Sequence, residues 1–133
     1  MLKKSNNLQL YKEGLYFLSL GGIGEIGANC YLYCCDGKWI MIDLGLSFAD
    51  EKFPGVDLLV PKIDSIESIE NNLEAIIISH GHEDHAGAVA FLANKITCPV
   101  YATKFAKLLI ENRLKEFNKI EGFTLNEIDL DKK

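Results

Sequence analysis

The alternation of apolar and polar residues predicts strands at the start of the chain and strand–helix units after them. The predicted strands occupy residues 15–20, 28–35, 38–42, 73–79, 100–102 and 123–128. Asp36-Gly37 is a strong two-residue hairpin signal between the second and third strands. Residues 21–27 are expected to form a glycine-rich turn, and residues 48–61 an irregular surface segment. Strands first and then strand–helix alternation are typical of a layered α/β sandwich.

Three helices are predicted in the second half of the chain. A short one spans about residues 64–72, and one rich in small residues spans 86–95. A third follows Thr103, whose side chain is suited to cap it. Its apolar stripe recurs at helical spacing and indicates core packing: Ala106, Leu109, Ile110, Leu114 and Phe117. Glu111 and Lys115 are spaced to pair on its outer face.

Composition and charge narrow the class of protein. The chain has 133 residues, enough for about one domain, of which residues 1–14 are expected to be a flexible start. With 48% apolar and 25% charged residues, it is not expected to be disordered. No apolar run approaches the roughly 18 residues of a membrane span, and no signal peptide is evident, so we expect a cytoplasmic protein without membrane contact. The net charge of −5 argues against a broad phosphate-binding face, although bound divalent cations invert the local field.

The four cysteines are consistent with a cytoplasmic protein. Cys30, Cys34, Cys35 and Cys98 contain no C-x-x-C pair, and neighbouring Cys34 and Cys35 must point to opposite faces of a strand. We therefore expect buried free thiols rather than disulfides or a thiolate zinc site.

All three histidines lie in the segment His80-Gly81-His82-Glu83-Asp84-His85, directly after the apolar run 75–79. In an extended segment, His80 and His82 point the same way and can converge on one cation. Asp84 and His85 follow after the chain turns, so they can face a second position close by. Two cations about 3.5–4 Å apart would clamp the attacking and the leaving oxygen of a displacement. The zincin motif H-E-x-x-H is absent, because His82 and His85 are three apart rather than four.

The glycines also suggest a different chemistry. Residues 22–27 match G-x-G-x-x-G, and Asp43 follows about twenty residues later, as in dinucleotide-binding folds. In those folds the third glycine opens a helix, whereas residues 30–37 favour a strand and a hairpin. We therefore expect no nucleotide cofactor, and a tight bend that brings the backbone close to the metal pocket.

The histidine segment resembles the H-x-H-x-D-H signature of the metallo-β-lactamase superfamily. Further segments resemble the ribonuclease J type of its β-CASP branch and span roughly residues 15–105: "LSLGGIGEIGANCYLY", "WIMIDLGLSF", "PGVDLLVP", "IIISHGHEDHAGAVAFL" and "CPVYAT". The histidine motif alone is shared by lactamases, glyoxalases, lactonases and tRNA-processing nucleases. The glycine segment and "PGVDLLVP" favour the ribonuclease J type.

The resemblance implies an α/β fold, a metallo-β-lactamase-type αββα sandwich of which this chain holds the N-terminal half. It implies a phosphodiesterase with two Zn²⁺, or Mn²⁺ in their place, that degrades RNA from the 5′ end and also cuts internally. His80 and His82 would hold one cation, Asp84 and His85 the other, and the metal-bound hydroxide held by the same residues would attack phosphorus.

Three further residues are candidates to touch and orient the ligands: Asp43, Asn29 and Glu83. Asp43 matches the first motif of the family, although by itself it is equally well explained as part of a strand-end turn with Gly45. Glu83 is at least as well explained as an ordinary solvated or salt-bridged acid.

The chain departs from the family in one respect. No histidine follows His85, whereas the family completes its site with later histidines and a bridging aspartate. Each cation would have two ligands here, against the usual three. We therefore expect residues 1–133 to be a single truncated domain, inactive alone, with the remaining ligands beyond its C-terminus, RNA as substrate and homo-oligomerisation left open. The alternatives are a glyoxalase- or lactonase-like hydrolase and a non-catalytic metal-binding or interaction module.

Overall fold

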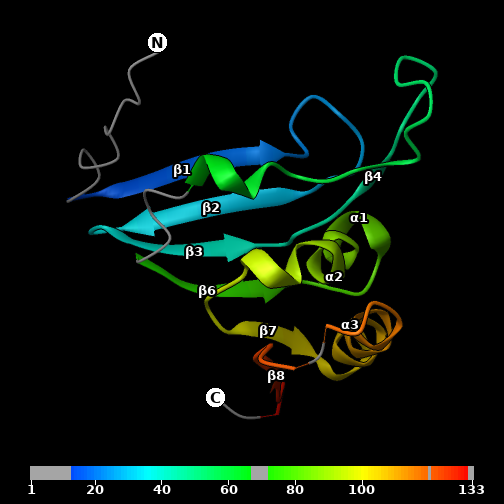
Figure 1. Cartoon of the computed structure of the whole chain (residues 1–133). Helices are drawn as coiled ribbons and strands as arrows, with labels where there is room; N and C mark the ends of the chain where they lie inside the picture. Colours follow the sequence, from blue (N-terminus) through cyan, green and yellow to red (C-terminus); the bar gives the residue numbers. More distant parts are fainter. Residues whose placement is uncertain (1–12, 67–71, 120, 132–133) are drawn as a thin grey trace.

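A six-stranded mixed sheet forms the centre of the molecule, a computed structural model that describes residues 13–66, 72–119 and 121–131 (Figure 1). The strands are β1 (Leu15–Gly21), β2 (Cys30–Cys35), β3 (Lys38–Ile42), β6 (Leu73–Ile78), β7 (Val100–Thr103) and β8 (Leu125–Ile128), in the order β1-β2-β3-β6-β7-β8. The first three pair antiparallel, and β3, β6, β7 and β8 pair parallel with their neighbours. The predicted meander followed by strand–helix units is confirmed.

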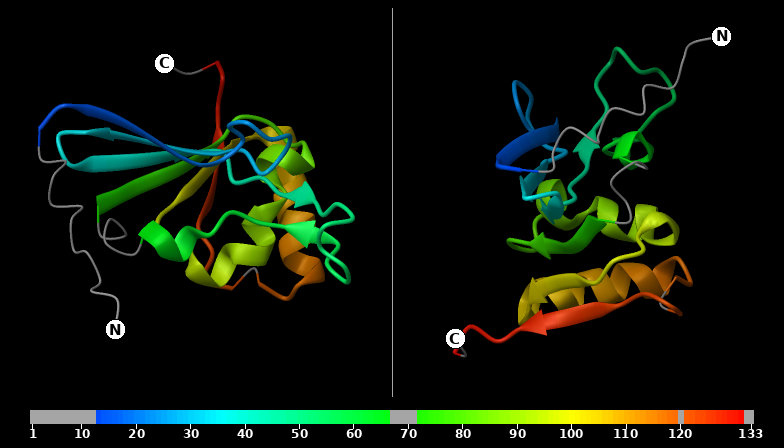
Figure 2. Two further views of the ribbon diagram at one scale, coloured as in Figure 1. Left: turned by 90° about the horizontal axis from the view of Figure 1, so that it is seen from above. Right: turned by 90° about the vertical axis from the view of Figure 1, so that its left-hand side faces the viewer.

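The helices gather on one side of this sheet, as the view from above shows (Figure 2). They are α1 (Glu83–Ala86), α2 (Ala88–Leu92) and α3 (Lys104–Glu116), with short 3-10 turns η2 (Ile63–Ile66) and η4 (Ala93–Lys95). The largest buried side chains come from the strands, from the turn after β3 and from α2 and α3: Leu32, Trp39, Met41, Leu44, Ile76, Ile78, Val89, Val100 and Leu114. Burial of this apolar surface against the helices is the main source of stability.

The opposite face of the sheet is also apolar but more exposed. Phe17 pairs with Tyr33 and Tyr33 with Ile40 across β1, β2 and β3, so these side chains share that face. Their exposed fractions are 51%, 41% and 36%. The sheet therefore has one face packed under helices and one that presents apolar and aromatic side chains.

The β2–β3 hairpin follows the sequence signal closely. Asp36 and Gly37 have φ values of 48° and 81°, the left-handed conformations that a type I′ turn requires. Aspartate tolerates this conformation better than most residues, and glycine adopts it freely. This turn fixes the register in which Tyr33 lies opposite Ile40 and Tyr31 opposite Ile42.

Two predicted segments differ in the structure. The irregular segment 48–61 contains a small ladder of β4 (Ser47–Phe48) with β5 (Leu58–Leu59), too short to produce a detectable alternation. The predicted helix over 64–72 is a 3-10 turn as far as residue 66, and residues 67–71 lie outside the described part of the chain. The prediction for residues 1–14 lies outside it as well, except for Glu13 and Gly14.

The helix predicted over 86–95 begins earlier, at Glu83, inside the histidine segment. Two carboxylates in its first turn, Glu83 and Asp84, favour a helix start there because they interact well with the helix dipole. The helix then divides at Gly87 into α1 and α2.

On α3 the predicted apolar stripe is buried at Ala106, Ile110 and Leu114, whereas Leu109 and Phe117 remain 37% and 39% exposed. Glu111 pairs with Lys107, 3.8 Å away, instead of with Lys115.

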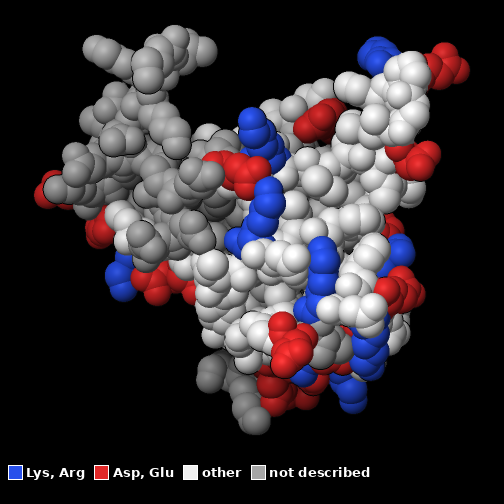
Figure 3. All heavy atoms as spheres, in the orientation of Figure 1, with Lys and Arg blue, Asp and Glu red and all other residues white. Residues whose placement is uncertain are grey.

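The surface does not carry one broad basic field on the face shown in Figure 3. Lysine and arginine side chains of the described residues lie beside acidic ones there, as expected for a chain with net charge −5. Within the described residues, no helix is both long and apolar enough to cross a bilayer. The four cysteines are free thiols, and Cys30 and Cys34 are buried. The prediction of burial is wrong for Cys35, which is exposed because it points to the opposite face of β2 from Cys34, and Cys98 is only half-buried.

Candidate functional site

The candidate site lies where β3 and β6 end. These strands are parallel neighbours with Ile42 opposite Ile77, so the residues that follow them leave the sheet side by side. Asp43 Oδ1 accepts a hydrogen bond from the Ser79 backbone N–H at 2.7 Å, and Oδ2 accepts one from the Ser79 hydroxyl at 2.9 Å. The carboxyl ends of parallel strands are where open α/β sheets commonly place their ligand sites. The sheet therefore brings Asp43 to the start of the histidine segment.

The three imidazoles lie against one another. His80 Nε2 is 3.1 Å from His82 Nδ1, and the ring centroids of His80 and His85 are 4.0 Å apart. His80 Nδ1 is 3.0 Å from the Ser79 hydroxyl. The extended residues 79–82 carry the first two rings, and the start of α1 carries the third. One β-strand end and one helix start therefore place all three histidines in one cluster.

Asp43 determines which nitrogen of His85 faces the cluster. His85 Nδ1 lies 2.8 Å from Asp43 Oδ2, and Nε2 lies 3.3 Å from Asp84 Oδ2. A carboxylate can only accept a hydrogen bond at this distance, so Nδ1 carries the hydrogen and, in the neutral ring, Nε2 keeps its lone pair. The Asp43 side chain is only 3% exposed, so the residues packed around it restrict the movement of its carboxylate. Asp43 thus contacts a candidate ligand directly, as predicted.

Asn29, which precedes β2, is brought to the same place. Its Nδ2 donates to the Asp84 carbonyl oxygen at 3.0 Å and to Asp84 Oδ2 at 3.3 Å. Nδ2 also lies 3.4 Å from His85 Nε2. The structure therefore places Asn29 against the second pair of candidate ligands, as predicted.

The backbone of α1 is held by residues from two other loops. The carbonyl oxygens of Glu83, Asp84 and His85 accept hydrogen bonds from the N–H groups of Leu46 at 3.0 Å, Asn29 at 3.0 Å and Leu44 at 2.8 Å. At Asp84 and His85 these contacts replace intrahelical partners that a helix of four residues cannot supply, whereas the Glu83 carbonyl also accepts from the Gly87 N–H at 2.9 Å. The position of the ligands is thus fixed by main-chain bonds as well as by side chains.

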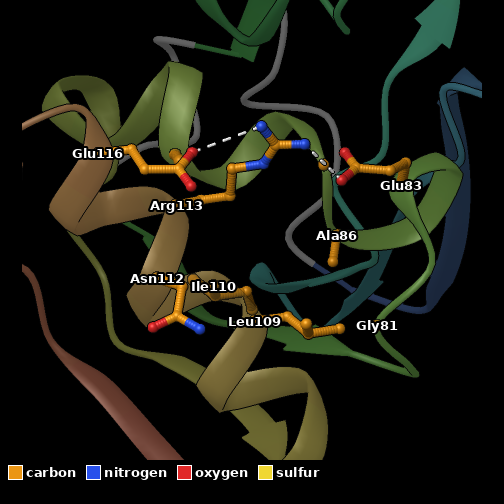
Figure 4. Close-up of a pocket in the computed structure, with 10 residues that line it drawn as sticks. Gly81, Glu83, Ala86, Leu109, Ile110, Asn112, Arg113 and Glu116 are labelled. Carbon is orange, nitrogen blue, oxygen red and sulfur yellow. Dashed lines mark hydrogen bonds and ion pairs between the residues drawn. The ribbon is translucent and has the colours of Figure 1, made fainter.

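Glu83 lies apart from these contacts. Its Oε1 accepts a hydrogen bond from Arg113 Nη2 of α3 at 2.7 Å, and Arg113 also lies 3.6 Å from Glu116 (Figure 4). The hydrogen bond to Glu83 raises the pKa of Arg113 above its ordinary value. The pair borders a pocket of about 300 Å³ between α1 and α3, into which Leu109 projects toward Gly81. Glu83 is therefore a salt-bridged acid on the side of α1 that faces α3.

Sequence reasoning missed three residues that contribute to this arrangement: Ser79, Tyr31 and Arg113. Ser79 holds Asp43, Tyr31 donates to Asn29 Oδ1 at 2.8 Å, and Arg113 binds Glu83. The partners of Ser79 and Arg113 are distant in the sequence, so the local pattern carries no signal for those contacts. Tyr31 lies only two residues from Asn29, and this spacing on one face of a strand could have served as a signal. For Ser79, its position directly before the histidine segment could have served as a signal.

The donor set suits divalent cations in its chemistry but is incomplete in number. Imidazole nitrogens and a carboxylate are the ligands that zinc and manganese accept. Within the described residues, no three histidine, cysteine, aspartate and glutamate side chains are grouped so that they alone could hold a metal ion. His80 Nε2 lies 3.1 Å from His82 Nδ1, and Asp84 Oδ2 lies 3.3 Å from His85 Nε2. The chain offers two pairs of donors, His80 with His82 and Asp84 with His85.

Comparison with known proteins identifies the family. A model of the metallo-beta-lactamase superfamily matches residues 23–131, and the chain belongs to this superfamily. The curated Ribonuclease J of Sinorhizobium meliloti is 43% identical over 81% of this chain and 20% of its own length. Ribonuclease J2 of Bacillus subtilis is 33% identical over 96% of this chain and 22% of its own length. The chain thus spans about a fifth of the length of these relatives.

Among solved structures, the Rm3 metallo-beta-lactamase is similar, with 25% identity, a TM-score of 0.44, and coverage of 74% of this chain and 36% of its own.

Proposed function

We propose that this chain forms part of a metal-dependent phosphodiesterase of the ribonuclease J type that cleaves RNA. The observation that carries the proposal is the cluster of His80, His82 and His85 with Asp84, in contact with Asp43 and Asn29 at the strand ends. Membership of the metallo-beta-lactamase superfamily and 43% identity to a ribonuclease J support the same reaction.

We assign each residue a role that agrees with its contacts. His80 and His82 would hold one cation, and Asp84 and His85 the other. Two divalent cations bound there would supply Lewis-acid activation of water and stabilisation of charge on the phosphate. Asp43 keeps the proton on His85 Nδ1, so that Nε2 presents its lone pair, and Asn29 restrains the Asp84 carboxylate. Zn²⁺ is our first assignment, and Mn²⁺ accepts the same donors.

Two donors per cation are fewer than the three that catalytic zinc usually keeps. We therefore place the remaining ligands outside this chain, in the protein that carries it, and assign no activity to residues 1–133 alone. The proposed reaction includes removal of nucleotides from the 5′ end and internal cleavage. The four free cysteines support a reducing, cytoplasmic location.

The test is an RNA-cleavage assay on the protein that carries this chain, with 5′-monophosphorylated RNA as substrate. His82→Ala and Asp84→Ala should each abolish cleavage, because each removes one of only two donors to a cation. Asp57→Asn, which alters an exposed acid of the same chain, is the matched control and should cleave normally. A chelator should abolish cleavage by the unaltered protein, and added Zn²⁺ or Mn²⁺ should restore it.

Undiminished cleavage by the His82 or Asp84 variant would refute the ligand assignment. Hydrolysis of a thioester or lactone without RNA cleavage would replace the phosphodiesterase with a glyoxalase- or lactonase-like enzyme. Stoichiometric metal binding by the protein that carries this chain, without hydrolysis of any of these substrates, would indicate a binding module.

A further inference from the structure

We propose that Tyr31 is a positioning residue for the candidate metal site. Its hydroxyl holds the Asn29 amide, and that amide restrains Asp84 and His85. The inference rests on the proposed function, because it assigns Tyr31 a role toward the same pair of ligands.

The Asn29 side chain is held at both ends. Its Nδ2 donates to the carbonyl and carboxylate oxygens of Asp84, which can only accept, so the NH₂ group must face that way. Its Oδ1 then faces Tyr31, whose hydroxyl donates to it at 2.8 Å. The same hydroxyl is 3.3 Å from the Gly22 carbonyl oxygen, but its single hydrogen serves the shorter contact. Without the hydroxyl, the amide would be anchored only at its Asp84 end.

The strand in turn holds Tyr31. Tyr31 lies opposite Ser19 on β1 and opposite Ile42 on β3, directly before Asp43. Its ring stacks on Phe17 with a centroid separation of 6.0 Å. The aromatic ring is therefore fixed by the sheet, and its hydroxyl can serve as a rigid anchor for the more mobile amide.

The glycine-rich segment makes room for this contact. A Cβ on Gly22 would collide with the Tyr31 hydroxyl, and it would collide with the Asn29 Oδ1 at 2.5 Å. Gly22 also has a φ of 81°, which side chains other than glycine rarely adopt. The glycine at position 22 is therefore explained by this contact. It needs no nucleotide-binding role, because residues 22–27 match G-x-G-x-x-G but no helix follows them.

The experiment compares Tyr31→Phe with Tyr33→Phe. Both changes remove one hydroxyl from β2, and both side chains project from the same face of the sheet. Tyr33 is 41% exposed, and its hydroxyl has no hydrogen-bond partner among the described residues. Tyr33→Phe therefore controls for the loss of a tyrosine hydroxyl as such.

Two readouts do not depend on catalysis. Titration of the protein with Co²⁺ alone should show an affinity about tenfold weaker in Tyr31→Phe, as is typical when a residue that orients a ligand is lost. The side-chain amide resonances of Asn29 should shift in the nuclear magnetic resonance spectrum of the same variant before metal is added. Tyr33→Phe should match the unaltered protein in both measurements.

In the protein that carries this chain, Tyr31→Phe should lower kcat for RNA cleavage with KM little changed, because the hydroxyl does not contact substrate in this assignment. Unmoved Asn29 resonances and unchanged Co²⁺ affinity in Tyr31→Phe would overturn the inference. If the inference alone fails, His82→Ala still abolishes RNA cleavage. If the proposed function fails, either the unaltered protein cleaves no RNA or His82→Ala cleaves it normally, whatever Tyr31→Phe does to Co²⁺ affinity.

Discussion

At the scale of single residues, Asp43 is the side chain on which the site most depends. It is the only buried polar or charged side chain in the part of the chain that the structure describes. A buried carboxylate is costly unless its oxygens are hydrogen-bonded, and Asp43 meets this condition through Ser79 and His85. Its φ of 63° places it in the left-handed region, which aspartate and asparagine tolerate better than most residues.

Asp43→Asn therefore isolates the effect of the charge, because asparagine has the same shape and tolerates the same backbone conformation. The amide must place its NH₂ group against a donor, either Ser79 or His85 Nδ1. We expect the free energy of unfolding to fall by about 2 kcal/mol, the typical contribution of hydrogen bonds to a charged group. Chemical denaturation of the chain measures this change.

Asp36→Asn is the control for that substitution. Asp36 also has a positive φ, of 48°, but it lies exposed in the β2–β3 turn, where asparagine is equally suited. It should leave stability nearly unchanged. Equal stability losses in the two variants would show that the backbone, and not the buried charge, governs the response at Asp43.

The cysteines give a second prediction at this scale. Burial, and then the nearby charge of Asp43, raise the pKa of Cys30 to about 12. Burial also raises the pKa of Cys98 above its ordinary value. Because the thiolate is the reactive form, an alkylating reagent at pH 8 should modify exposed Cys35 first and leave Cys30 unmodified in the native chain. Mass spectrometry of the alkylated peptides checks the order.

The same shift has a consequence for stability. The folded state keeps the Cys30 proton up to about pH 12, whereas the unfolded chain loses it near the ordinary thiol pKa of 9.0. The contribution of this thiol is therefore fully present below pH 9 and is lost as the pH rises toward 12. Cys30→Ala should reduce the decline in stability over that range, as denaturation at several pH values would show.

At the scale of elements, the site depends on how closely the turn after β3 approaches α1. A Cβ on Gly45 would overlap the backbone carbonyl of Asp84, so no side chain fits there. The same approach allows Leu44 and Leu46 to donate to the carbonyls of His85 and Glu83. Gly45 is required by this contact and not by its backbone conformation, because its φ lies outside the positive range.

Gly45→Ala should therefore destabilise the chain much more than Gly24→Ala. Gly24 has a φ of 76°, but a Cβ there meets nothing within 4 Å. Its replacement should cost about 1–2 kcal/mol, the strain of alanine in the left-handed region. Gly45→Ala must instead separate α1 from the turn and should weaken Co²⁺ binding as well. Thermal unfolding and metal titration of both variants test this, and equal losses would contradict it.

The bounds of the elements show how much of the fold could be predicted from the sequence. Alternation placed β3 and the hairpin turn correctly and located β1, β2 and β6 to within two residues of their ends, because each buries one face or both. It placed the start of α1 at Ala86 instead of Glu83. A helix of four residues has no apolar period, and tertiary hydrogen bonds to its carbonyls hold it in place. The candidate ligands stand out in the sequence because their spacing is local, and their assignment stays a prediction. Arg113 was missed because it binds Glu83, thirty residues away, through a contact that only the fold creates.

At the scale of the whole molecule, cation binding should be linked to folding. The candidate donors come from the loop after β6 and from α1, and the residues that hold them come from β2 and the turn after β3. These elements lie together only in the folded chain, so a cation that needs them binds the folded state. Any ligand of this kind stabilises the protein by mass action, by about 2.7 kcal/mol at a concentration one hundred times its Kd.

Zn²⁺ at such a concentration should therefore raise the midpoint of thermal unfolding of the chain by roughly 10 °C, and a chelator should reverse the increase. His82→Ala and Asp84→Ala should each lose about half of it, because each leaves one cation with a single donor from this chain and the other pair intact. Asp57→Asn should retain it, since the altered acid lies on the β4–β5 segment. If the increase persists in full in both ligand variants, the cation binds elsewhere and the cluster at residues 80–85 is not its site.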